Sequence, residues 1–403
     1  MSARVVNLDM GRRELAGDRP WWLALDGDFY KRDDRFTMPL LDRAAVEATA
    51  SLDVGLRRLG AAGVALTAVP LGFNPLQLRR AMKESERYRA AADAKDPSVI
   101  FSEPPLGVAI HRSTPRDFVF RPTNGTCEDW SFESPFQPIH ERQTRDYLRH
   151  RRNATAHVRV WRHEDGPRPT VILIHGYFAE AKWFNEWYFD LRRIYDMGLD
   201  VALFTLPFHG PRAGNGSLFS GHQFFAGGLS RINEAFAQAV MDLRVLVRHL
   251  LDETGAPSVG VTGISLGGYT TALLATIEPR LSFAIPNVPV VSLPDLVLEW
   301  TPIGTAVRLG MTIFRQRLSD VRWVTAGHCP LSYAPVLPRE RLMVIGGVAD
   351  RLAPPKHARL LWEHWGQPRI HWFPGSHVLH VRRGAYLTEM RQFLREIDFL
   401  PPQ

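Results

Sequence analysis

Cysteine is scarce in this chain, and its scarcity excludes whole classes of protein. The 403 residues include two cysteines, Cys127 and Cys329, which are far apart and outside any CxxC spacing. Two isolated thiols cannot build a disulfide framework or a thiolate zinc site, so a reducing compartment is the default. Residues 1–9 also lack the apolar core of a secretory signal. We therefore predict a cytoplasmic location.

Long apolar runs and dense basic runs are missing as well. The two most apolar windows, 61–71 and 293–311, are too short or are interrupted by charge and proline, so no membrane span is expected. The net charge of +7 is mild for this length, and no basic stripe carries interleaved aromatic residues. Nucleic-acid binding is therefore not expected. Nothing in the sequence specifies an oligomeric state.

The length and composition are those of a globular protein with a substantial core. Apolar residues make up 45% of the chain and charged residues 23%. Helix-like segments at 43–59 and 75–91 set the first hundred residues apart. We predict a mainly helical extension over 1–105, followed by a larger domain over 106–403.

From residue 154 onward, strand-like and helix-like segments alternate, which is typical of an α/β sheet. Runs of apolar and β-branched residues predict strands at 154–161, 169–174, 199–206, 258–263, 281–286, 342–345 and 369–373. Helical periodicity or composition predicts helices at 181–195, 232–251, 269–276, 356–365 and 385–397.

The most informative motif is Gly263-Ile-Ser265-Leu-Gly267, which follows one predicted strand and precedes a predicted helix. In that setting G-x-S-x-G forms a nucleophile elbow, a turn so tight that side chains flanking the serine would collide with their surroundings. Glycine at 263 and 267 removes those side chains. Ser265 can then adopt a strained conformation that exposes its hydroxyl.

A serine hydroxyl needs a base, and the base needs a carboxylate to fix its tautomer. His377 lies just after the last predicted strand, and Asp350 follows the strand before it. Both therefore fall at the carboxyl edge of the sheet, where reacting groups gather in open α/β folds. His371 and His380 are weaker candidates for the base. Asp295 and Asp320 are the alternatives for the acid, and Asp350 has a rival interpretation as a helix N-cap.

These elements occur in the order serine, acid, histidine, and His175-Gly176-Tyr177 follows an earlier strand. Over roughly residues 150–400 the chain resembles the α/β-hydrolase superfamily. The resemblance implies a mostly parallel central sheet flanked by helices, with Ser265, Asp350 and His377 as a catalytic triad. It also implies an oxyanion hole built from the backbone N–H groups of Leu266 and Tyr177. Loss of one such donor typically costs about 10²–10³ in rate.

Several further residues are predicted to border the site. The candidate substrate-binding residues are His175, Phe178, His209 and Arg212. His175 is interpreted mainly as a residue that shapes its own loop. The 207–212 segment is equally compatible with a structural turn. Aromatic residues of the 181–195 helix are candidates for an acyl pocket, with core packing the stronger interpretation for most of them. A cap is expected over 287–337, where four residues are candidates to roof the pocket: Trp300, Ile303, Phe314 and Trp323.

The leading prediction is a serine hydrolase acting on a small-molecule carboxylic ester through an acyl-enzyme, with no metal or organic cofactor. An acyltransferase or a thioesterase would use the same triad, and a non-catalytic binding protein could keep the fold. Short patches around His175, the Phe208-His209-Gly210 loop and the elbow also resemble the α/β-hydrolase-domain-containing-protein-18 group. The oxyanion loop of that group departs from the His-Gly pattern found here.

Overall fold

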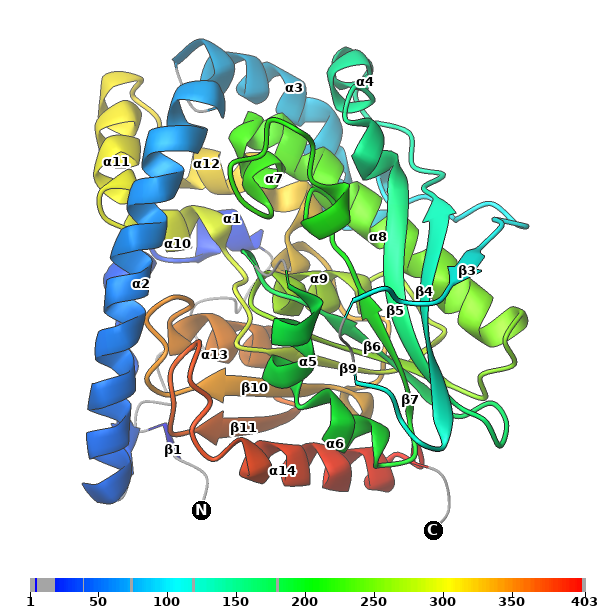
Figure 1. Cartoon of the computed structure of the whole chain (residues 1–403). Coiled ribbons are helices and arrows are strands. Elements are labelled where there is room, and N and C mark those ends of the chain that lie inside the picture. The colour runs from blue at the N-terminus through cyan, green and yellow to red at the C-terminus, as the bar shows by residue number, and fades with distance from the viewer. Residues whose placement is uncertain are drawn as a thin grey trace.

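The computed structural model describes residues 4–5, 19–38, 40–72, 75–117, 120–178 and 181–400. The prediction about a secretory signal falls mostly on residues outside these ranges. Within them, a large mixed sheet forms the centre of the molecule and helices cover both of its faces (Figure 1). The alternation predicted from residue 154 is confirmed.

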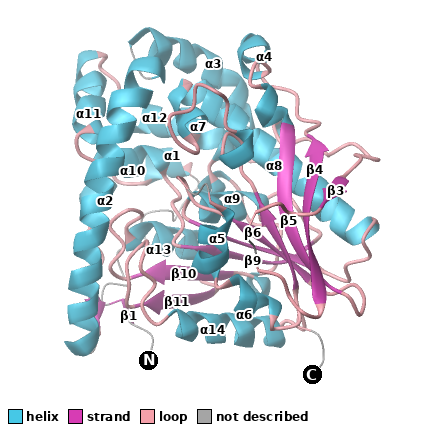
Figure 2. Ribbon diagram, viewed as in Figure 1, coloured by secondary structure: helices cyan, strands magenta, loops and turns pink. Residues whose placement is uncertain are grey.

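The main sheet has nine strands in the described part of the chain, in the order β11-β10-β9-β8-β6-β7-β5-β4-β3. Strands β6 to β11 pair in parallel, while β5, β4 and β3 add antiparallel strands at one side (Figure 2). The strands are β3 (His111–Ser113), β4 (Gly125–Glu133), β5 (Thr155–His163), β6 (Thr170–Ile174), β7 (Asp200–Phe204), β8 (Val259–Ile264), β9 (Leu281–Asn287), β10 (Met343–Gly347) and β11 (Arg369–Phe373). A separate two-stranded sheet joins β1 (Arg4–Val5) to β2 (Phe36–Thr37).

Both faces of the central strands are buried, as expected for parallel strands covered by helices. Because side chains alternate along a strand, Ile172 and Ile174 of β6 enter one core while Val171 and Leu173 enter the other. The helices are α1 (Trp21–Ala24), α2 (Leu40–Gly72), α3 (Pro75–Ala94), α4 (Glu141–Tyr147), α5 (Lys182–Phe189), α6 (Leu191–Tyr195), α7 (His222–Ala226), α8 (Gly228–Asp252), α9 (Leu266–Leu274), α10 (Leu293–Glu299), α11 (Ile303–Ile313), α12 (Leu318–Val324), α13 (Pro355–His364) and α14 (Arg383–Glu396).

Two helices differ from the sequence prediction. The single helix expected over 181–195 is divided at Asp190, whose φ of 52° places it in the left-handed region and ends α5 before α6 begins. The helix expected over 43–59 runs on to Gly72 as part of α2. No helix within the described ranges is both long and apolar enough to cross a membrane.

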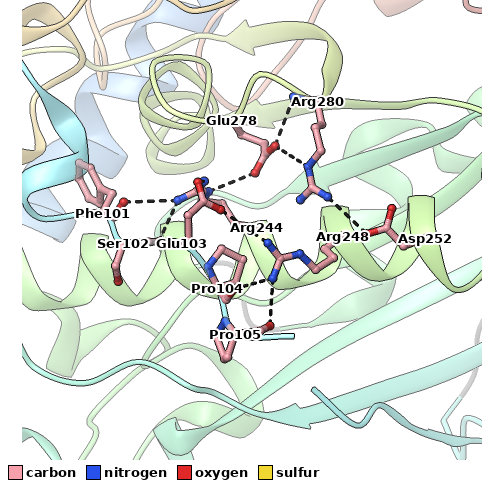
Figure 3. A network of polar contacts seen from close by, with 10 residues as sticks. All are labelled: Phe101, Ser102, Glu103, Pro104, Pro105, Arg244, Arg248, Asp252, Glu278 and Arg280. Atoms are coloured by element: carbon pink, nitrogen blue, oxygen red, sulfur yellow. Dashed lines mark hydrogen bonds and ion pairs between the residues drawn. The ribbon is translucent and has the colours of Figure 1, made fainter. Parts of the chain in front are cut away.

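Arginines of α8 hold the end of the N-terminal extension against the core (Figure 3). Arg244 donates to the backbone carbonyl of Ser102 at 2.8 Å and to the buried carboxylate of Glu278 at 3.1 Å. Arg248 donates to the carbonyl of Pro105 at 3.0 Å. Apolar residues of the extension also belong to the same hydrophobic core as residues of the sheet. The division of the chain at residue 105 stays a prediction.

Candidate active site

Ser265 lies in the turn between β8 and α9, with φ of 58° and ψ of −113°. Side-chain-bearing residues rarely adopt a positive φ, so this backbone is strained. A Cβ on Gly263 would lie 2.3 Å from the carbonyl oxygen of Gly267, and one on Gly267 would lie 2.0 Å from that of Ile174. Neither position has room for a side chain. The two glycines are thus the local reason that the turn closes as tightly as the sequence motif requires.

His377 and Asp350 form a direct pair. The imidazole Nδ1 lies 2.7 Å from Asp350 Oδ2, and the two residues are 9% and 1% exposed. The other carboxylate oxygen of Asp350 accepts the N–H groups of Leu352 at 2.9 Å and Ala353 at 2.7 Å. Asp350 therefore shapes its own turn, while the N-cap of α13 is Pro354. The parallel neighbours β10 and β11 bring the two residues together at one edge of the sheet.

The electrostatic surroundings of the pair follow from its burial. Burial alone lowers the pKa of the His377 imidazole, but the Asp350 carboxylate outweighs this effect and raises the pKa above its ordinary value. Asp53 acts on His377 in the same direction. Burial also raises the pKa of the Asp350 carboxyl, and the charge of His377 opposes that shift.

A cavity of about 1090 Å³ brings the remaining elements together; Ser265 and His377 both line it, as do Tyr177 and Leu266. A Cβ on Gly176 would lie 3.4 Å from the Cβ of Ser265, so the 175–177 loop packs directly against the elbow. Leu266 is the first residue of α9, and the first N–H groups of a helix have no acceptor within it. Among the described residues, no group of three His, Cys, Asp or Glu side chains is arranged to hold a metal ion.

Comparisons with known proteins agree with this architecture. Two solved structures cover most of the chain: acetyl xylan esterase 1 from Thermoanaerobacterium sp. JW/SL YS485 and an acetyl xylan esterase from Paenibacillus sp. R4. The first has a TM-score of 0.53 at 18% identity and covers 79% of this chain and 98% of its own. The second has a TM-score of 0.53 at 14% identity and covers 78% and 94%. The chain has the α/β-hydrolase fold.

Sequence comparisons give relatives but no assigned family. No protein-family model matches the chain. Two Mycobacterium tuberculosis proteins, uncharacterized proteins Rv2627c and MT2702, are 31% identical to it over 259 residues. The matched region is 61% of this chain and 59% of each relative, so the chain spans less than two thirds of their length.

Within this α/β-hydrolase fold, the alternative acids and bases have other partners. Asp295 is buried in an ion pair with Arg322 at 2.6 Å. Asp320 accepts the N–H of Arg317 at 2.9 Å, at the start of α12. The imidazole of His380 lies 2.9 Å from the hydroxyl of Tyr188, and His371 is part of β11. None of these four alternatives lines the cavity.

Two predicted substrate-binding residues are structural instead. Arg212 has no exposed surface; it donates to Asp242 at 2.8 Å and to the carbonyl of Asn153 at 2.9 Å. This corrects the prediction that Arg212 contacts substrate. His209 is also fully buried, with Nδ1 2.8 Å from the carbonyl of Pro207, and it does not line the cavity. The 207–212 segment is a structural turn, because the Arg212 guanidinium and Nδ1 of His209 both engage groups within the protein.

His175 connects two loops. Its Nε2 accepts the N–H of Leu206 at 3.1 Å, and its Nδ1 lies 2.8 Å from the carbonyl of Gly176. Burial lowers the pKa of His175 to about 4, so the ring is neutral at pH 7 and can accept at one nitrogen while it donates at the other. His175 is absent from the cavity wall. It shapes the loop that carries Tyr177, as the sequence interpretation preferred.

Most of the aromatic candidates do face the cavity. Phe178, with φ of 65°, lines it together with Trp183 and Phe184. The stronger sequence interpretation, core packing, is therefore wrong for Trp183, which is 63% exposed, whereas Phe184 lines the cavity and also packs against a hydrophobic core. In the predicted cap, three of the four residues named above line the cavity as expected. The exception is Trp323, whose ring packs beneath the Arg89 guanidinium at 3.5 Å.

Sequence reasoning did not identify the particular residues that α2 contributes to the site. Leu56, Leu59 and Gly60 line the cavity from this helix, and the buried carboxylate of Asp53 accepts the N–H of His377 at 2.8 Å. More than 300 residues separate Asp53 from His377. A lone acidic residue within a helical run gives no signal of its tertiary partner, so no pattern in the sequence could have identified it.

Proposed function

We propose that the chain is a serine hydrolase that acts on carboxylic esters. The observation that carries the proposal is the Asp350–His377 pair, 2.7 Å long, on a cavity that also contains the strained Ser265. The two acetyl xylan esterases with TM-scores of 0.53 add support, because they are named as esterases and share the fold.

In the proposed reaction, Ser265 Oγ attacks the ester carbonyl while His377 removes its proton. Asp350 engages Nδ1 of the imidazole, which leaves Nε2 for proton transfer. The backbone N–H groups of Leu266 and Tyr177 receive the developing negative charge on the carbonyl oxygen. His377 then returns the proton to the leaving alcohol. Water, activated by the same imidazole, hydrolyses the acyl-enzyme and releases Ser265.

The test is covalent labelling with a fluorophosphonate, which reacts with activated serines. We expect the wild-type protein to be labelled and Ser265→Ala to be unlabelled, whereas an exposed-serine control, Ser98→Ala, should label like the wild type. Turnover of p-nitrophenyl esters should fall by about 10⁶ in Ser265→Ala. A folded wild-type protein that neither labels nor hydrolyses esters would instead be a binding protein.

The same triad serves other acyl transfers, so the assay must separate them. An acyltransferase would release p-nitrophenol faster when an acceptor alcohol is added, and it would form the ester of that alcohol as its second product. Faster turnover of matched thioesters would identify a thioesterase. The cytoplasmic location and membership of the α/β-hydrolase-domain-containing-protein-18 group stay predictions from the sequence.

A further inference from the structure

The cavity beside Ser265 is large and almost free of charge. Its volume of about 1090 Å³ slightly exceeds that of ordinary small-molecule sites, which span roughly 300–1,000 Å³. In the described part of the chain, no Asp, Glu, Lys or Arg lines it. A charged acyl group would find no counter-ion there, and a sugar would find few partners for its hydroxyls. The walls suit a ligand made mostly of hydrocarbon.

Apolar side chains of the cavity also reach the surface. Leu59 of α2 is 74% exposed, and Leu309 and Ile313 of α11 are 61% and 64% exposed, yet all three line the cavity. Helices α2 and α11 contact each other at one end of the molecule (Figure 1). Exposed apolar surface that adjoins a site indicates a place where an apolar ligand or lipid makes contact.

We propose that the acyl group of the substrate is a long hydrocarbon chain, as in a fatty-acyl ester. This inference rests on the proposed ester hydrolysis. An acetyl group, as named for the two structural neighbours, would leave most of the 1090 Å³ without contacts. A longer chain places further methylenes against the apolar wall. Each buried methylene can improve binding by up to about fourfold, so chain length should govern specificity.

Gly60 of α2 offers a way to shorten the cavity. A Cβ at this position would lie 3.7 Å from ring atoms of both Phe178 and Trp300, which line the cavity themselves. Gly55, on the same helix, has nothing within 4 Å of its Cβ position and is exposed. Gly55→Phe is therefore a matched control, with the same substitution in the same helix outside the cavity.

The experiment measures kcat/KM for p-nitrophenyl acetate, butyrate, hexanoate, octanoate and decanoate, each below its micelle concentration. We expect wild-type values to rise by roughly two- to fourfold per methylene, and Gly60→Phe to lower the decanoate-to-acetate ratio at least tenfold while Gly55→Phe keeps it. Hydrolysis of acetate with no rise along the series would overturn the long-chain inference and leave the esterase proposal intact. Absence of hydrolysis for every ester would overturn the esterase proposal itself.

A second observation concerns Asp53, a buried carboxylate of α2 with no exposed surface. Its Oδ2 accepts the N–H of His377 at 2.8 Å and the N–H of Arg351 at 3.1 Å. One helical turn later, Arg57 donates to the carbonyl of Arg351 at 3.1 Å. The helix thus contacts both the loop that carries the proposed base and the loop that carries the proposed acid.

We infer that Asp53 is a positioning residue that holds the Asp350 and His377 loops together. Its Oδ1 has no hydrogen-bond partner among the described residues, so the two N–H groups are its main compensation for burial. Hydrogen bonds from the backbone to an ionised carboxylate are stronger than neutral ones. The N-terminal extension therefore contributes a residue that contacts both loops of the proposed active site.

Two substitutions, Asp53→Asn and Asp53→Ala, separate the effect of the Asp53 charge from that of its hydrogen bonds. The charged and titratable neighbours of His377 are Asp350 after β10, Asp53 on α2, Tyr188 on α5 and His380 in its own loop, with Arg383 of α14 beside His380. Asp53→Asn keeps an acceptor but removes a negative charge that raises the pKa of His377. The acid limb of the pH–rate profile should therefore move to lower pH, with kcat largely kept.

Asp53→Ala removes the acceptor as well, and we expect kcat to fall at least tenfold with KM changed less than twofold. The exposed acid-to-amide change Glu47→Gln on the same helix is the control and should alter neither quantity. A merely structural role would change the folded fraction but not the pH limb of the folded enzyme. An unshifted limb in Asp53→Asn, with wild-type kcat, would overturn the inference even if Asp53→Ala failed to fold.

Discussion

Two buried pairs, each of a carboxylate and a basic side chain, are nearly identical in length but differ in their access to the large cavity. Asp350 and His377 lie 2.7 Å apart at the carboxyl edge of the sheet, and Arg212 and Asp242 lie 2.8 Å apart beside α8. His377 borders the large cavity, whereas neither member of the second pair does. Pair distance and burial therefore do not distinguish the pair that we propose to be reactive from the one that we interpret as structural; access to a ligand-sized cavity does.

The chemistry of the partners explains the difference. An arginine stays protonated, so Arg212 can only neutralise Asp242 and tie it to the carbonyls of Thr205 and Asn153. A histidine can release and regain a proton near neutral pH. His377, the titratable residue, lines the large cavity. Arg212, which is permanently charged, does not line it and has no exposed surface.

Among variants of the two pairs, the largest expected effect comes from Asp350→Asn, which leaves the shape of the site but alters the tautomer of His377. We expect kcat for ester hydrolysis to fall by about 10⁴ with little change in the urea midpoint of unfolding. Steady-state kinetics and urea denaturation on the same preparation check both parts. Near-wild-type kcat would show that Asp350 does not serve the reaction.

The opposite outcome is expected for Arg212→Met, which leaves a buried carboxylate without its partner. The free energy of unfolding should fall by about 3–5 kcal/mol, while kcat per folded molecule stays within twofold. Denaturant unfolding with active-site titration gives both numbers.

The double variant Arg212→Met/Asp242→Leu replaces the whole pair by apolar side chains and should recover most of the lost stability. A loss of kcat in either variant, at equal folded fraction, would favour the original prediction that Arg212 contacts substrate.

Buried histidines without a carboxylate partner extend the comparison to stability. Burial lowers the pKa of His175 to about 4 and those of His328 and His380 to about 3. Between pH about 6.5 and these values, the unfolded chain binds protons that the folded chain does not. The contribution of these histidines to the free energy of unfolding should therefore be fully present above pH about 6.5. It should fall as the pH is lowered, by about 1.4 kcal/mol per pH unit for each histidine.

Chemical denaturation between pH 7 and pH 4 measures that slope. His328→Gln should reduce it by about 1.4 kcal/mol per pH unit, the contribution of a single histidine. A wild-type slope that is unchanged by this substitution would mean that His328 is not buried as a neutral ring.

The smallest expected effect is a displacement of the pH–rate profile. Hydrolysis needs neutral His377, and Asp350 raises the pKa of this imidazole. The acid limb of kcat/KM should therefore lie above about 6.5, the ordinary imidazole value. In Asp350→Asn the limb of the residual activity should move to lower pH. A wild-type limb below the ordinary value would contradict the assignment of His377 as the base.

Local sequence patterns were sufficient for most of the sheet and for the turn at Ser265. Apolar and β-branched runs predicted every strand from β5 to β11, because the strands are buried on both faces and bounded by clear turn residues. The elbow was predictable because sterics at Gly263 and Gly267 act over a few residues. The break at Asp190 was not, since left-handed backbone at a non-glycine residue leaves little mark in composition.

The α/β alternation and the order in which Ser265, Asp350 and His377 occur could be predicted from the sequence, because periodicity and turn sterics are local properties. Which polar residues border the cavity depends on long-range packing. Arg212 lies outside the cavity and pairs with Asp242 on α8. Asp53 contacts His377 from a helix more than 300 residues earlier in the chain. Contacts across such distances depend on how the layers pack, and no local pattern records that packing.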